Sequence, residues 1–228
     1  MFFDPLYLLF AIPGLILAGL ASMYTHTTFS EYSDKRSNSG ITGAEAAAMM
    51  LRRAGITDVT IERVDGFLSD HYDPTSRTLR LSSKVYGEDS LAAIGVACHE
   101  AGHALQHASG YGPLNLRCAL VPVTNISSFL SYGVILLGFL FQSSGMVMFG
   151  AVLFSAAVVF AIVTLPVEWD ASARAKKMMV TAGIVSEYER DGAGRVLNAA
   201  FLTYVAAALS SLLTLLYYLL RASMMNRD

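Results

Sequence analysis

Residues 98–107 read CHEAGHALQH and carry three histidines and one glutamate that could do chemistry. Residues four apart lie on one face of a helix, so His99 and His103 can direct ring nitrogens at a single metal ion. Zinc binds such nitrogens at about 2.0–2.1 Å in tetrahedral geometry, and a catalytic site leaves one position for water. Glu100 lies about 100° further round the helix, off the ligand face. The pattern predicts a zinc hydrolase in which Glu100 is the general base that takes a proton from the attacking water.

The neighbours of these residues have simpler expected roles. His107 continues the four-residue spacing, but at 1.5 Å per residue it lies about 12 Å along the helix axis from His99, too far to share the ion. We expect it to be a helix-end or packing residue. Gly102 is expected to leave room near the ion, and Cys98, one residue out of the ligand register, to be a small buried thiol.

A third ligand must come from elsewhere in the chain. The segment LPVEWDASARA, residues 165–175, follows a long apolar run and contains Glu168. An ionisable residue beside a bilayer is costly unless it has a partner, so it is functional by default. Glu168 is therefore the predicted third ligand of Zn²⁺, although other first-row ions can occupy the same ligands.

The elements that hold these residues include membrane segments, because 54% of the chain is hydrophobic. Runs of roughly 20 apolar residues are long enough to cross a bilayer. Four qualify: Leu6–Met23, Val123–Phe141, Met146–Leu165 and Val196–Leu220. Only QSSG separates the second from the third, which predicts a tight transmembrane hairpin. A signal peptide is the alternative for the first run, but no Lys or Arg precedes it, so we predict an anchor.

Two observations predict which parts of the chain face which side of the membrane: the number of crossings and the distribution of basic residues. Four crossings place residues 24–122 and 166–195 on one side of the membrane. That side holds most basic residues near the membrane ends: Lys35, Arg36, Arg117, Arg174, Lys176, Lys177, Arg190 and Arg195. The other side holds Arg221 and Arg227. The positive-inside rule predicts that the larger side is cytoplasmic, where a disulfide between the two cysteines is not expected. The net charge of -2 gives no sign of a nucleic-acid partner.

The polar segments predict a small α+β scaffold. Thr42 and Glu45 fit a capping box that begins a helix ending near Gly55. Alternating patterns at residues 59–64 and 77–82, with turn signals between them, predict two or three short antiparallel strands. Ser90 is a plausible N-cap for a helix from Leu91 to Ala108, which carries the histidine motif. The uncharged apolar stretch before the motif is too short for this helix to span the membrane.

With HEAGHALQH and LPVEWDAS both present, the chain resembles the YugP-like family of bacterial membrane zinc metallopeptidases. The segments LSDHYDP, LRLSSKVYGEDSLAAIGVACHEAGHALQH, LVPVTNISS and VLNAAFLTYVAAAL are similar to family blocks as well. The resemblance implies a gluzincin-like membrane protease, distantly similar to HtpX-type enzymes. It implies that His99, His103 and Glu168 are metal ligands and that Glu100 is the catalytic acid/base.

The expected fold is an α+β membrane protein, mainly α-helical, with about four transmembrane helices and a small zincin-like domain containing a short antiparallel sheet. The expected segments are an N-terminal anchor (1–24), the zincin-like domain (25–122), a transmembrane hairpin (123–165), a helix with the third ligand (166–195), and a C-terminal transmembrane helix with its tail (196–228). The expected location is the bacterial plasma membrane.

Some residue roles stay open. Many gluzincins carry an Asp four residues after the glutamate ligand, and here that position is Ser172. Asp170 is only two residues after Glu168, roughly 200° round a helix, so its role is open. His71, Tyr72 and Arg195 are unranked candidates for stabilising the oxyanion of the reaction.

The expected partners are the lipid bilayer and a peptide or membrane-protein substrate. The strand at residues 77–82 is expected to offer a sheet edge to an extended substrate. A proteolytically silent zinc scaffold is the alternative function, but Glu100 favours the enzyme because a scaffold needs no base. A transporter is disfavoured since the apolar runs show no charged residue facing a pathway. An oligomer is possible.

Overall fold

The computed structural model of the chain describes residues 4–66 and 69–226. Contacts divide the chain into two compact units. Unit 1 comprises Met1–Ser22, Asn115–Pro166 and Leu202–Asp228, and unit 2 comprises Met23–Leu114 and Val167–Phe201. The predicted fold class, a mainly helical α+β membrane protein, is confirmed.

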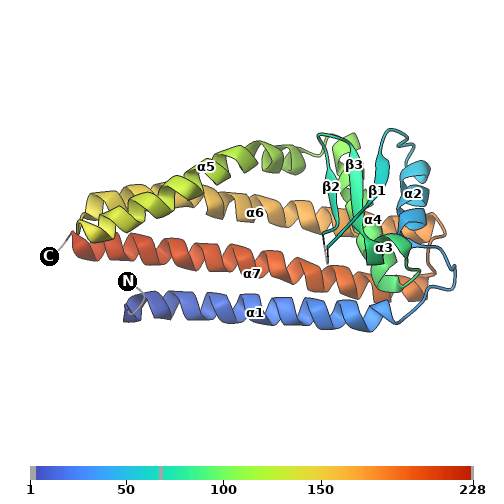
Figure 1. Cartoon of the computed structure of the whole chain (residues 1–228), viewed down its shortest axis with the longest axis horizontal. Coiled ribbons are helices and arrows are strands. Elements are labelled where there is room, and N and C mark those ends of the chain that lie inside the picture. Colours follow the sequence, from blue (N-terminus) through green and yellow to red (C-terminus); the bar gives the residue numbers. More distant parts are fainter. Residues whose placement is uncertain (1–3, 67–68, 227–228) are drawn as a thin grey trace. The chain divides into compact units, whose positions relative to one another are not determined.

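Four helices are long and apolar enough to cross a membrane, as the sequence predicted. They are α1 (Pro5–Ser33), α5 (Gly112–Leu140), α6 (Ser144–Thr181) and α7 (Glu187–Met225), labelled in Figure 1. Each extends beyond its apolar run. As a result, α6 carries both the third apolar run and Glu168 on one continuous helix.

Unit 1 consists of the apolar parts of these helices. The predicted tight hairpin between α5 and α6 is present, and the Ser143 amide donates to the Gly138 carbonyl at 2.8 Å. Many large apolar side chains of unit 1 are exposed, among them Leu15 (71%), Phe129 (81%) and Leu140 (70%). Such side chains are what helices facing lipid present to hydrocarbon. Arg227, which entered the charge count, lies outside the described residues.

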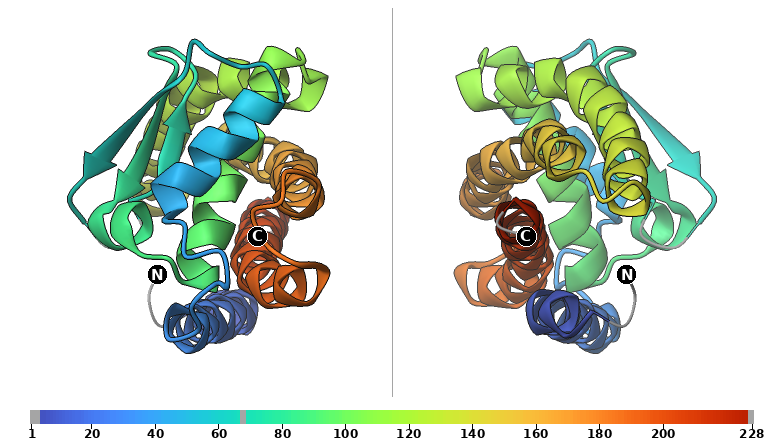
Figure 2. Two further views of the ribbon diagram at one scale, coloured as in Figure 1. Left: turned by 90° about the vertical axis from the view of Figure 1, so that its right-hand side faces the viewer. Right: turned by 90° about the vertical axis from the view of Figure 1, so that its left-hand side faces the viewer.

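Unit 2 holds the α+β scaffold. Its shorter elements are α2 (Gly43–Arg53), β1 (Thr60–Val64), β2 (His71–Asp73), β3 (Thr78–Ser82), α3 (Ser83–Gly87) and α4 (Leu91–Ala108). Helix α2 packs on α4, and the sheet lies beside α4, as the left view of Figure 2 shows. Small side chains along α4, such as Ala97 and Ala101, are fully buried in the core of this unit.

Two predicted helix starts in unit 2 are confirmed. Thr42 and Glu45 form a reciprocal capping box at the start of α2. The Ser90 hydroxyl accepts a hydrogen bond from the Ala93 amide at 3.2 Å, which satisfies one of the free donors at the start of α4. Helix α4 therefore begins where the sequence predicted, and its first turn fixes the positions of the histidines that follow.

The sheet differs from the prediction in two ways. Its strand order is β1-β3-β2, with β3 parallel to β1 and antiparallel to β2, so the sheet is mixed and not wholly antiparallel. The turn signal after β1 does not pair β1 with β2; residues 67–68 of that connection lie outside the described residues. Strand β3 is central because Leu79 and Leu81 are fully buried. The expectation that residues 77–82 offer a free edge is therefore wrong, and the free edges belong to β1 and β2.

Candidate metal centre

The three predicted ligands come together in unit 2. Glu168 Oε2 lies 3.2 Å from His99 Nε2 and 3.6 Å from His103 Nε2. One ligand atom from each residue can be chosen so that all three lie within 4.8 Å of one another. Tetrahedral zinc with bonds of about 2.0–2.1 Å separates its ligand atoms by roughly 3.3 Å. The three side chains therefore fit one ion of this size with little movement.

The site is buried and negatively charged. The side chain of Glu168 is only 2% exposed, and those of His103 and His99 are 9% and 14% exposed. Burial disfavours the charged form of His103, but the hydrogen bond to Glu168 and the charges of Glu100 and Glu168 outweigh this effect and raise the pKa of His103. The same negative charge attracts a metal cation.

A close contact between α4 and α6 produces this arrangement. A Cβ atom on Gly102 would lie 2.6 Å from the Ala171 carbonyl oxygen, so glycine is required where the two backbones meet. His99 and His103 lie three residues before and one after Gly102. Glu168 lies three residues before Ala171 on α6, just as His99 lies three residues before Gly102 on α4. The expectation that Gly102 leaves room near the ion is corrected here, because the space at Gly102 is taken by the backbone of α6.

The far nitrogens of both histidines have partners that the sequence did not identify. Ser172 Oγ lies 3.1 Å from His99 Nδ1, and Gln106 Oε1 lies 2.9 Å from His103 Nδ1. Hydrogen bonds to this second nitrogen orient metal-binding histidines in many proteins. Ser172 occupies the position four residues after Glu168 where many gluzincins carry Asp. Gln106 is fully buried and lies three residues after His103, on the same helix.

Asp170 reaches the site only indirectly. Its Oδ2 accepts hydrogen bonds from Gln106 Nε2 at 2.9 Å and from Arg174 Nε at 2.6 Å. Gln106 Nε2 also donates to the Val167 carbonyl at 2.8 Å. The expectation that Asp170 cannot take the place of an Asp at position 172 agrees with this geometry, since Asp170 bonds to Gln106 while Ser172 bonds to His99.

Glu100 follows His99 on α4 and is buried, with 9% of its surface exposed. Within residues 4–66 and 69–226, no hydrogen bond to its carboxylate is found. It is close enough to His103 for its charge to raise the pKa of that ring. A carboxylate that is not committed to a protein donor is chemically suited to accept a proton from water. Its catalytic role stays a prediction.

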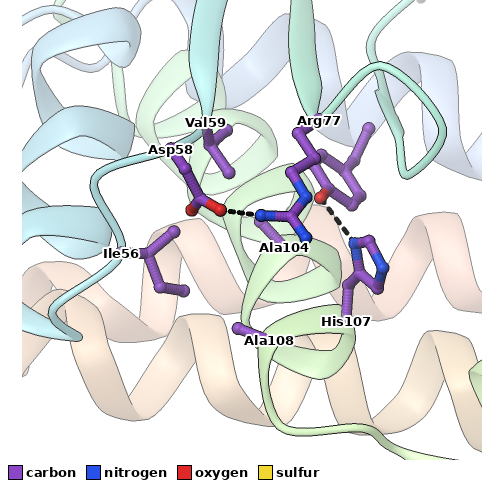
Figure 3. A pocket seen from close by; sticks show the side chains of 8 residues that line it. Ile56, Asp58, Val59, Arg77, Ala104, His107 and Ala108 are labelled. Carbon is purple, nitrogen blue, oxygen red and sulfur yellow. Dashed lines mark hydrogen bonds and ion pairs between the residues drawn. The ribbon is translucent and has the colours of Figure 1, made fainter.

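His107 lies outside the ligand group, as predicted. Its Nδ1 is 2.8 Å from the hydroxyl of Tyr72, and the two rings border a cavity of about 290 Å³ (Figure 3). Arg77 pairs with Asp58 at the same cavity. Tyr72 thus bonds to a histidine one turn beyond the ligand pair.

The other two candidates for oxyanion stabilisation also lie away from the triad. His71 is exposed on β2, and its Nδ1 is 2.8 Å from the Ser69 carbonyl oxygen. Arg195 is exposed on α7. The hydrogen bonds and ion pairs found among the described residues connect neither of them to the triad. The oxyanion role of His71, Tyr72 or Arg195 stays a prediction.

The two cysteines, Cys98 and Cys118, are both free thiols. Cys98 is fully buried in the core of unit 2, as expected, and burial raises the pKa of its thiol to about 12. Cys98 is not among the residues whose ligand atoms come together near His99. Cys118 is exposed on α5.

The four long apolar helices and the group of His99, His103 and Glu168 indicate a membrane protein with residues that could hold a metal ion. Comparison with known proteins specifies the family: the chain belongs to the family described as "putative neutral zinc metallopeptidase", which matches residues 7–223. The chain is also 46% identical over 215 residues to "Putative membrane protease YugP" of Bacillus subtilis (strain 168), covering 94% of this chain and 96% of that protein. The resemblance noted from the sequence is confirmed. No solved structure matches the chain significantly.

Proposed function

We propose that this protein is a membrane-bound zinc endopeptidase that hydrolyses peptide bonds. The observation that carries the proposal is the meeting of His99, His103 and Glu168 within 4.8 Å, with Glu100 adjacent on α4. The family description and the name of the Bacillus relative support the same activity. A scaffold would need the three ligands but not the glutamate beside them.

In the proposed reaction, zinc held by the triad would supply Lewis-acid polarisation of the scissile carbonyl and of a water molecule. Glu100 accepts a proton as the water oxygen bonds to the carbonyl carbon. The C–N bond then breaks, and Glu100 gives the proton to the leaving amine nitrogen. Ser172 and Gln106 hold the two ligand rings while this happens, and the burial of the triad limits access of bulk water.

We further propose that substrates bind as extended segments along β2. This strand has a free edge and contacts α4, and Tyr72 of β2 bonds to His107 on that helix. Main-chain pairing at a sheet edge recognises extended chain of almost any sequence. Unfolded loops, segments beside the membrane and small peptides fit this mode of binding.

The function is tested by metal removal on the detergent-purified full chain. We expect about one zinc ion per chain by mass spectrometry, in keeping with a single three-ligand site. Cleavage of casein should stop when 1,10-phenanthroline removes the metal and return when zinc is added. If zinc-loaded protein cleaves neither casein nor unstructured peptides, the scaffold function replaces the enzyme; cleavage that survives removal of the metal rejects the zinc mechanism.

We also propose that unit 2 faces the cytoplasm of a bacterial cell, because the basic residues near the membrane ends gather on its side. Tyr188 in α7 is almost fully exposed and is a suitable reporter position. In a Cys98→Ala, Cys118→Ser background, Tyr188→Cys should react with a membrane-impermeant maleimide in inverted vesicles and stay unlabelled in intact cells. Labelling in intact cells would reverse the orientation.

A further inference from the structure

The amide of Gln106 is engaged at both ends, and its orientation is determined by chemistry. Its Nε2 lies 2.8 Å from the Val167 carbonyl oxygen and 2.9 Å from Asp170 Oδ2. A backbone carbonyl and a carboxylate accept hydrogen bonds, so the NH₂ group of the amide must face them. The amide oxygen therefore faces His103 Nδ1, at 2.9 Å.

This orientation selects one form of His103. An amide oxygen cannot donate, so the hydrogen bond requires a proton on His103 Nδ1. In the neutral ring, Nε2 then carries the lone pair. Nε2 is also the nitrogen that faces Glu168, at 3.6 Å from its Oε2. With Nδ1 engaged as a donor to Gln106, Nε2 is the nitrogen of His103 that is left for a metal ion.

His99 is held in a different way. Its Nδ1 is 3.1 Å from the hydroxyl of Ser172. A hydroxyl can donate or accept, so Ser172 orients the His99 ring without selecting its tautomer. The two histidines of one motif therefore differ in how strictly their protonation is set.

Asp170 and Arg174 complete the chain of contacts behind His103. Arg174 Nε donates to Asp170 Oδ2 at 2.6 Å, and Arg174 also lies 3.3 Å from the Ser109 hydroxyl near the end of α4. The ion pair keeps the carboxylate beside the Gln106 amide. Without Asp170, the Val167 carbonyl alone would hold the NH₂ group in place.

We propose that Gln106 is a positioning residue of the metal centre that fixes the Nδ1-protonated form of His103, and that Asp170 holds the Gln106 amide in the orientation this requires. The inference rests on the proposed function in one respect, the binding of zinc by the triad. It does not depend on whether the chain cleaves peptides.

The test is zinc affinity of the full chain in detergent, measured by competition with a chromogenic chelator. Gln106→Leu should weaken zinc binding about 10- to 100-fold, the usual effect of losing a group behind a ligand histidine. Asp170→Ala should have a smaller effect of several-fold, because Val167 still accepts from the amide. Asp170→Asn should stay within about twofold of native, since an amide oxygen can accept from both donors.

A matched control separates positioning from general loss of packing. Ile94→Ala changes a fully buried residue of α4 that lies five positions before His99. It should lower the unfolding midpoint of the metal-free protein and leave zinc affinity unchanged. Gln106→Leu should weaken zinc binding far more than Ile94→Ala does, whatever its own effect on the unfolding midpoint.

Two results would overturn the inference: native zinc affinity in Gln106→Leu, or equal losses in Gln106→Leu and Ile94→Ala. If Gln106→Leu does not fold, the two Asp170 variants decide, and equal affinities for Ala and Asn at position 170 reject the role of Asp170. A native chain that binds zinc but cleaves nothing would sink the proposed enzyme while the affinity series still stands.

Discussion

Replacement of Glu100 by glutamine should reduce peptide-bond cleavage by about 10²- to 10⁴-fold, the range that a general base contributes. Glutamine has nearly the same shape as glutamate but cannot accept the proton of the attacking water. Glu100 is not among the three residues that surround the site of the ion, so zinc content should stay at the native level. Cleavage and metal content should be measured on the same purified samples.

The matched control for Glu100→Gln is Glu62→Gln, which makes the same chemical change on an exposed residue of β1. This variant should cleave and bind zinc as the native chain does. Cleavage by Glu100→Gln at the native rate would remove Glu100 from the mechanism. Loss of zinc from Glu100→Gln would show that Glu100 supports the metal centre itself.

Replacement of Glu168 by alanine should have the largest effect on the metal. Its carboxylate oxygen approaches both histidines, at 3.2 and 3.6 Å, and supplies the negative charge of the ligand set. Loss of a ligand should exceed the roughly 10- to 100-fold cost of losing a group behind one, so we expect zinc affinity to fall more than about 100-fold. Cleavage should disappear with the metal.

The shape and charge of Glu168 can be separated with Glu168→Gln, which keeps the side-chain volume and one oxygen. It should bind zinc more weakly than the native chain but more tightly than Glu168→Ala. Glu187→Ala removes an exposed carboxylate from the start of α7 and serves as the control. Full zinc occupancy in Glu168→Ala would mean that the third ligand is another residue.

That His99 and His103 point to one place could be predicted from the sequence because it depends on simple spacing. Two histidines four residues apart share a helix face whatever surrounds the helix. Glu168 could be predicted because a carboxylate at the end of a membrane helix needs a partner. Gln106 and Ser172 were missed as partners of the histidines. Ser172 meets His99 only because α4 packs on α6, which spacing along one helix does not show. Gln106 lies three residues after His103 on the same helix, so that spacing could have indicated its contact.

The helices were predicted more accurately than the sheet for a similar reason. The capping residues Thr42 and Ser90 act on the next three residues, so their effect is local and readable. Strand order depends on which strand has the most apolar side chains to bury. Leu79 and Leu81 bring β3 to the centre of the sheet, between two strands that precede it in the chain. The alternating patterns and the turn signals between them favoured pairing of strands that are neighbours in sequence, and therefore predicted an antiparallel arrangement.

The contact of Gly102 with Ala171 also sets the order in which the metal centre is assembled during synthesis. The ribosome completes α4, with both histidines, before it begins the α5–α6 hairpin. Glu168 emerges only after that hairpin, and it meets the histidines only when the two backbones touch. Metal binding is thus coupled to folding. A nascent chain therefore cannot bring the three residues together until α5 and most of α6 have been made.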